Sequence, residues 1–180
     1  MKELEVKILN IDINEMEKKL KTLGATLIDK EVQVNTLIDS KEEFIQNSLD
    51  SYLRIRETKS LLTNNIKLTL TMKKNINREG IRENIEINTD ITDKEALLEI
   101  LNSLGYYVYQ EGFKERTSYT LNNVRFDLDK WDDLTYPEPY MEIEVNVEDE
   151  LEAMIKLLNI PRGNISTKSI VELRKEKGLV

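Results

Sequence analysis

The chain begins with an alternating stretch, Glu3-Leu4-Glu5-Val6-Lys7-Ile8, in which every charged residue is followed by an apolar one. Successive side chains of a strand point to opposite faces, so Glu3, Glu5 and Lys7 share one face and the apolar residues share the other. In a single antiparallel strand such a charged face normally meets water. The pattern becomes informative because later strands repeat it.

The composition limits the class of protein. With 180 residues, of which 39% are hydrophobic and 33% charged, we expect a single domain spanning residues 1–180. A net charge of −8 argues against general nucleic-acid binding, which needs a positive surface. The first residues lack the apolar core of a signal peptide, and no run approaches about 18 apolar residues. We therefore expect a cytoplasmic protein that does not bind a membrane.

The sequence contains no cysteine and no histidine. This excludes disulfides, thiolate nucleophiles, Ser-His-Asp triads and zinc sites built from these residues. A bound metal would have oxygen ligands, which favour Mg²⁺, Mn²⁺ or Ca²⁺.

Helical and alternating patterns divide the chain into short elements. A helix is expected between the cap Asp12 and the stop Gly24, and a second between Thr92 and Gly105. Further helices are expected at about 148–158 and 167–177, and a polar connection at 41–51. The strand patterns cover residues 25–39, 52–56, 66–73, 81–87, 106–119, 124–129 and 141–145. Amphipathic helices would cover the apolar side of these strands.

The charged strand residues include both signs. The seven acids are Glu3, Glu5, Glu86, Asp127, Asp129, Glu142 and Glu144, and the nine bases are Lys7, Arg54, Arg56, Lys67, Lys73, Arg82, Lys114, Arg116 and Arg125. A solvent-facing sheet gives no reason for bases to gather in an acidic chain. Around a water-filled cavity, the bases would bind an anion and the acids a divalent ion, whereas dry burial of unpaired charges is costly. The alternation alone does not determine which way the faces point.

The order of these motifs resembles the CYTH superfamily, the triphosphate tunnel metalloenzymes that include class IV adenylyl cyclases and thiamine triphosphatases. Glu3-x-Glu5-x-Lys7 is similar to the ExExK signature, and the later likenesses are Leu53-Arg54-Ile55-Arg56, Thr71-Met72-Lys73, Arg82 with Glu86, Lys114-x-Arg116, Tyr140-Met141-Glu142-Ile143-Glu144 and the terminal Lys168-Ser169-Ile170-Val171-Glu172-Leu173. Two departures are Asn84, where the family tends to place a carboxylate, and the second strand, where Asn35 and Leu37-Ile38 replace acidic and aromatic residues.

The resemblance implies an α+β fold, in which an eight-stranded antiparallel barrel, open at both ends, has charges inside and helices outside. It implies metal binding by Glu3, Glu5, Glu142 and Glu144, with Asp127 and Asp129 as further candidates. It implies phosphate binding by Lys7, Arg54, Arg56, Lys73, Arg82, Lys114, Arg116 and Arg125, of which Lys7, Arg54, Lys73 and Arg116 would act in catalysis. Lys67, Glu86 and Asp127 are either site residues or ordinary ion pairs.

The activity that the resemblance implies is hydrolysis of a small triphosphate, with Mg²⁺ or Mn²⁺ as the cofactor. The substrate would be inorganic tripolyphosphate, thiamine triphosphate or a nucleoside triphosphate. A class IV adenylyl cyclase is the alternative, and a non-catalytic triphosphate-binding module is a third reading. Without histidine, the proton acceptor must be a carboxylate, a lysine of depressed pKa or metal-bound water. We expect a monomer or a homodimer.

Overall fold

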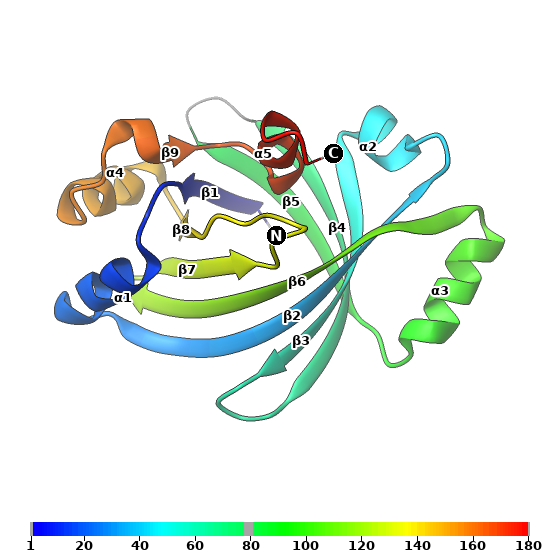
Figure 1. Cartoon of the computed structure of the whole chain (residues 1–180), viewed down its shortest axis with the longest axis horizontal. Coiled ribbons are helices and arrows are strands. Elements are labelled where there is room, and N and C mark those ends of the chain that lie inside the picture. The colour runs from blue at the N-terminus through cyan, green and yellow to red at the C-terminus, as the bar shows by residue number, and fades with distance from the viewer. Residues whose placement is uncertain (1, 78–80, 180) are drawn as a thin grey trace.

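The strands of the protein close into a barrel (Figure 1). The structure, a computed structural model, describes residues 2–77 and 81–179, with side chains for 4–76 and 81–179. The strands are β1 (Lys2–Ile8), β2 (Thr26–Ser40), β3 (Ser51–Ser60), β4 (Ile66–Asn77), β5 (Arg82–Asp90), β6 (Tyr106–Leu121), β7 (Val124–Trp131), β8 (Tyr140–Val145) and β9 (Ile165–Ser166). The helices are α1 (Ile13–Thr22), α2 (Phe44–Leu49), α3 (Lys94–Ser103), α4 (Glu148–Leu157) and α5 (Ile170–Glu176), and a short 3₁₀ turn covers Arg162–Asn164.

The strand order runs β5-β4-β3-β2-β6-β7-β8-β1, and β5 pairs again with β1. Every pairing is antiparallel, and β9 adds a short extra strand beside β1. Over the described residues this is the predicted α+β fold, a closed antiparallel barrel of eight strands.

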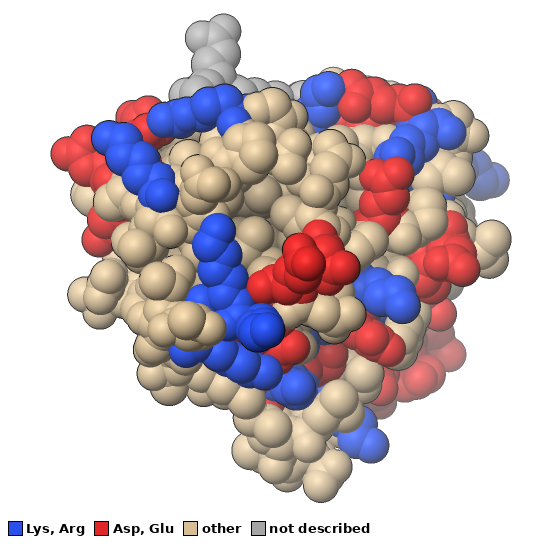
Figure 2. Space-filling view, turned by 60° about the vertical axis from the view of Figure 1, so that its left-hand side comes forward, with Lys and Arg blue, Asp and Glu red and all other residues tan. Residues whose placement is uncertain are grey.

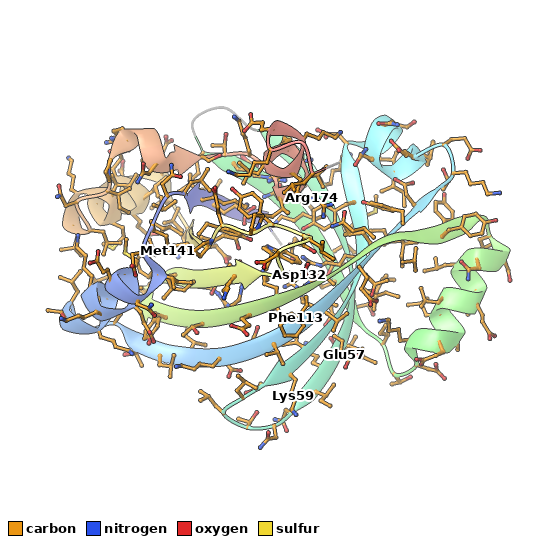
Figure 3. The ribbon with its side chains drawn as sticks, in the orientation of Figure 1. Glu57, Lys59, Phe113, Asp132, Met141 and Arg174 are labelled. Atoms are coloured by element: carbon orange, nitrogen blue, oxygen red, sulfur yellow. The ribbon has the colours of Figure 1, made fainter. Side chains whose placement is uncertain are left out.

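The hydrophobic core lies outside this barrel. Val6 and Ile8 of β1 pack against the same cluster as Leu20 of α1 and Ile155 of α4. Figure 1 shows α1 and α4 beside the same part of the barrel, and Figure 3 places Met141 of β8 on that side. The alternate residues of these strands consequently point into the barrel, as the family resemblance implied.

Local signals positioned most helix ends correctly. Asp12 accepts hydrogen bonds from the backbone of Asn14 and Glu15, at 2.9 and 3.0 Å, and begins α1 as predicted. Gly24 and Gly105 follow α1 and α3 with φ of +84° and +87°, a left-handed conformation that suits glycine. At the end of the chain, Ser169 caps α5, so that helix is shorter than the predicted range.

One helix was not predicted. The polar connection at 41–51 contains α2, whose start is held by Asp39 at the end of β2. Its carboxylate accepts from the backbone of Ile45 at 2.9 Å and of Gln46 at 3.0 Å. Because this cap lies several residues before the helix, the usual local capping pattern is missing. No helix in the described part of the chain is both long and apolar enough to cross a membrane.

Because the hydrophobic core lies outside the barrel, the residues packed there should contribute most to the free energy of unfolding. Leu20 of α1 has no exposed surface, whereas Ile87 of β5 is 65% exposed. We expect Leu20→Ala to lower the free energy of unfolding by about 2–5 kcal/mol, because it leaves a cavity in a packed cluster. Ile87→Ala should change it by about 0.5 kcal/mol or less. Urea denaturation measures both values, and equal losses would contradict this position of the core.

Candidate functional site

A cavity of about 540 Å³ occupies the barrel interior. Among the described residues, its wall carries the bases Lys7, Arg54, Arg56, Lys73, Arg82, Lys114, Arg116, Arg125, Arg174 and Lys175 and the acids Glu5, Asp50, Glu86, Asp127, Glu142, Glu144 and Glu172. The ten bases exceed the seven acids, although the whole chain has a net charge of −8. Figure 2 shows basic side chains gathered beside acidic ones on one face of the molecule. The cavity therefore suits an anion.

Arg116 of β6 is the most heavily bonded of these bases. Its guanidinium donates to both carboxylate oxygens of Asp129 and to Asp127, each at 2.6 Å, and to Glu142 at 2.7 Å. Burial alone would lower the pKa of Arg116, but these carboxylates outweigh it and raise the pKa well above its usual value. Arg116 is thus a permanently charged link between β6, β7 and β8.

Lys114 lies two residues before Arg116 and faces the same cavity. Its Nζ donates to Asp129 at 2.9 Å and lies 5.2 Å from the centre of the Trp131 ring. Burial, followed by the positive charge of Arg116, lowers the pKa of Lys114 to about 7, despite the attraction of Asp129. This ammonium can therefore lose its proton near neutral pH.

Glu5 is opposite Glu144 in the pairing of β1 with β8. Its carboxylate accepts from the Asn84 amide at 3.0 Å and lies 3.3 Å from the Lys73 ammonium. Burial would raise the pKa of Glu5, but Lys7 and Lys73 outweigh it and lower the pKa. The departure from the family pattern at Asn84 has a physical reason. The amide can donate a hydrogen bond to Glu5, whereas a second carboxylate would repel it.

Glu142 is two residue pairs further along, opposite Lys7 in the same register. Its carboxylate lies 3.1 Å from the Lys7 ammonium. Burial opposes ionisation, yet Lys7 and Arg116 hold the pKa of Glu142 well below its usual value. Glu5, which is buried, and Glu142, which is half-buried, are therefore both held in the ionised form.

The donor chemistry of β1 and β8 fits a hard divalent ion. Glu5, Glu142 and Glu144 present carboxylate oxygens on adjacent strands, and such oxygens are preferred by Mg²⁺ and Mn²⁺. The Glu3 side chain lies outside the described residues. Within the described ones, no three acidic groups converge closely enough to hold a metal ion, because the carboxylates face neighbouring bases.

The two aspartates of β7 differ in position. Asp127 lines the cavity and accepts from Arg116, Arg125 and Ser118. Asp129 is fully buried behind the cavity wall, with both oxygens bonded to Lys114 and Arg116. Asp129 is consequently placed to position bases, and this location does not suit the metal ligand that the resemblance implied.

Two donors on β2 and β3 in the cavity wall lack partners. Arg54 Nε and Asn35 Nδ2 are buried and make no hydrogen bond. A buried donor left unpaired costs about 1–3 kcal/mol, so such groups point to a missing acceptor. Beside them, Arg56 Nε donates to Asn35 Oδ1 at 2.8 Å. Burial, assisted by the charge of Arg54, lowers the pKa of Arg56 to about 10, which leaves it charged at neutral pH.

Residues 1–170 match the family model for the CYTH domain. The chain belongs to the CYTH family. Membership implies dependence on a divalent metal ion, and CYTH proteins act as triphosphatases or class IV adenylate cyclases.

Three relatives illustrate the extent of the likeness. A Methanocaldococcus jannaschii protein provisionally named adenylate cyclase is 28% identical over 97% of this chain and 99% of its own length. The solved structure of the PH1819 protein from Pyrococcus horikoshii is 24% identical, covers 97% of this chain and 99% of that one, and has a TM-score of 0.79. A Hippeastrum protein provisionally named adenylyl cyclase, described as having a dominant triphosphatase activity, is 16% identical, covers 98% and 95% of the two chains, and has a TM-score of 0.70.

The CYTH barrel brings most of the predicted residues together. All eight predicted phosphate-binding bases line the cavity, and so does Glu86, 3.1 Å from the Lys73 ammonium. Lys67 does not belong to this group. It lies 3.0 Å from Asp90 with 62% of its side chain exposed and does not line the cavity, which agrees with the ordinary ion pair that was the alternative reading.

Arg174 of α5 was missed by the sequence reasoning. It follows Ile170 and Leu173 on the packed side of the helix, and it lines the cavity. An arginine on the apolar side of a short helix was the available signal.

The Lys114 environment of this CYTH domain predicts an unusual titration. We expect the pKa of Lys114 Nζ to be about 7, whereas the pKa of a lysine in water is about 10.4. Between these two pH values, Lys114 binds more protons in the unfolded chain than in the folded one. The contribution of Lys114 therefore makes the free energy of unfolding rise as the pH increases. Lysine side-chain NMR, assigned by loss of one signal in Lys114→Arg, measures the pKa. Titration of Lys114 near pH 10 would contradict the burial effect.

Proposed function

We propose that residues 1–180 form a single tunnel domain that hydrolyses a small-molecule triphosphate with the help of a divalent metal ion. The observation that carries the proposal is the cavity wall, where bases outnumber acids and the buried donors Arg54 Nε and Asn35 Nδ2 lack acceptors. Phosphate oxygens would supply those acceptors. Arginine can bind phosphate through two parallel hydrogen bonds, and lysine binds it as a point charge.

The bases would act by neutralising charge. Lys7, Arg54 and Lys73 would bind phosphate oxygens and stabilise the charge that develops as the phosphoanhydride bond breaks. Arg116 would hold its part of the wall in position, because its bonds to carboxylates on β7 and β8 fix it across three strands. It would also contact the substrate. Arg56, Arg82, Lys114 and Arg125 complete the proposed phosphate-binding set.

Glu5, Glu142 and Glu144, together with Glu3, would hold the Mg²⁺ or Mn²⁺ ion. When bound, such an ion supplies Lewis-acid stabilisation of the phosphate and lowers the pKa of water. Lys114 is the described side chain best suited to hold or release a proton, because the pKa of its Nζ is about 7. Asp129 would keep that ammonium in place through its 2.9 Å contact.

A class IV adenylyl cyclase is the second candidate, favoured by the name of the Methanocaldococcus relative. The triphosphatase is preferred because the second strand has Asn35 and Leu37 in place of acidic and aromatic residues. The Hippeastrum neighbour, described with a dominant triphosphatase activity, agrees with this choice.

A product assay separates these activities. The protein would be incubated with Mg²⁺ or Mn²⁺ and with tripolyphosphate, thiamine triphosphate or ATP in turn. We expect phosphate release from at least one substrate and no accumulation of cyclic AMP. Cyclic AMP and pyrophosphate as the main products of ATP would support the cyclase instead. Tight binding without any turnover would support the non-catalytic module.

A substitution tests the carboxylates of β1. Glu5→Gln keeps the side-chain volume but removes the charge, so we expect metal-dependent turnover to fall by on the order of 100-fold or more. Circular dichroism should remain unchanged. Glu115→Gln is the matched control, because Glu115 is exposed on β6 and does not line the cavity. Full activity of Glu5→Gln would remove Glu5 from the metal site.

A further inference from the structure

Helix α5 forms part of the cavity wall. The residues of this helix and its cap that line the cavity are Ser169, Ile170, Val171, Glu172, Arg174 and Lys175. In Figure 1, α5 lies apart from α1 and α4. This helix therefore differs from the expected arrangement in which every helix only covers the outside.

Apolar and ionic contacts fix α5 in place. Leu173 is buried against Tyr136 and Tyr140, and Ile170 packs on the same cluster. Lys177, after the helix, lies 2.6 Å from the Glu138 carboxylate. These contacts set the position of Arg174 on the inner side of the helix.

Arg174 is a buried cation with few partners. It is 8% exposed, and Figure 3 shows it below α5, between the helix and the strands. Its Nη2 donates to the Leu179 carbonyl oxygen at 3.1 Å, while its Nε is buried without any partner. No carboxylate within the described residues forms an ion pair with it.

This arrangement is costly unless an anion completes it. A buried charge without a counterion loses its hydration, and a buried N–H without an acceptor adds a further penalty. Two other buried bases of the wall show the usual solution, since Lys7 pairs with Glu142 and Lys73 with Glu5. Arg174 instead faces the cavity, where a ligand oxygen can reach it.

We propose that Arg174 is a substrate-binding residue, and that its guanidinium donates to a phosphate oxygen of the bound triphosphate. The proposal rests on the proposed function of the tunnel and adds α5 to its binding surface. Removal of the terminal helix from the barrel would then weaken substrate binding as well as open the cavity.

The binding experiment uses the full chain and inorganic tripolyphosphate. Trp131 is the single tryptophan and lines the cavity, so its fluorescence reports binding directly. Arg174→Met retains an unbranched apolar stem, Arg174→Lys retains the charge, and Lys177→Gln removes an exposed ion pair of the same segment. The dissociation constant, the KM in Mg²⁺ or Mn²⁺ and the melting temperature without ligand are measured for each.

We expect Arg174→Met to weaken tripolyphosphate binding by about 10- to 100-fold, the effect of losing one hydrogen bond to a charged group. Its melting temperature should not fall, because the substitution also removes an uncompensated buried charge. Arg174→Lys should recover part of the affinity. Lys177→Gln should change binding less than about threefold, since exposed ion pairs contribute little.

Contrary results are distinguishable. If the wild-type protein binds and hydrolyses tripolyphosphate and Arg174→Met binds it equally well, the Arg174 proposal is wrong and the proposed function stands. If Arg174→Met melts earlier and Lys177→Gln weakens binding to the same extent, docking of α5 explains the effect and the direct contact is excluded. If the wild-type protein binds no tripolyphosphate, the same comparison is made with the triphosphate that it hydrolyses, and failure to bind any of the three overturns both proposals.

Discussion

The fold depends on the bonds between Arg116 and the carboxylates of Asp127, Asp129 and Glu142. They join β6, β7 and β8 from inside the barrel and compensate a guanidinium that would otherwise be too costly to bury. Similar pairs, such as Lys7 with Glu142, extend the network to β1. Small barrels are usually filled with apolar side chains, and this network is what allows a polar cavity in their place.

A charged interior moves the hydrophobic core to the outside. Phe126 and Ile143 have no exposed surface, and they face outward into the cluster that contains Leu151 of α4. The outer face of the barrel is not covered everywhere, since Ile66 on β4 and Ile87 on β5 are 64% and 65% exposed. Stability and binding are therefore divided between two sides of the same strands, which lets the inner face keep unpaired donors for a ligand.

Much of this structure could be predicted from period-two alternation, which correctly separated the two faces of nearly every strand. Alternation is symmetric, however, and only the resemblance to the CYTH family assigned the charged face to the interior. The failures involve contacts that short sequence patterns do not cover. Asp39 caps α2 from the end of β2, Asp129 is enclosed by Lys114 and Arg116, and Arg174 reaches the cavity only because α5 docks there. Such pairings are set by packing that no local pattern encodes.

We propose that the inward charges bind a triphosphate together with a metal ion. A crystal structure grown with tripolyphosphate and Mn²⁺, recorded at the manganese absorption edge, tests it most directly. We expect the polyphosphate inside the barrel, with oxygens bonded to Arg54 Nε and Asn35 Nδ2, and an anomalous peak beside Glu5 and Glu144. An empty barrel under these conditions, with polyphosphate or manganese bound only on the outer surface, would contradict it.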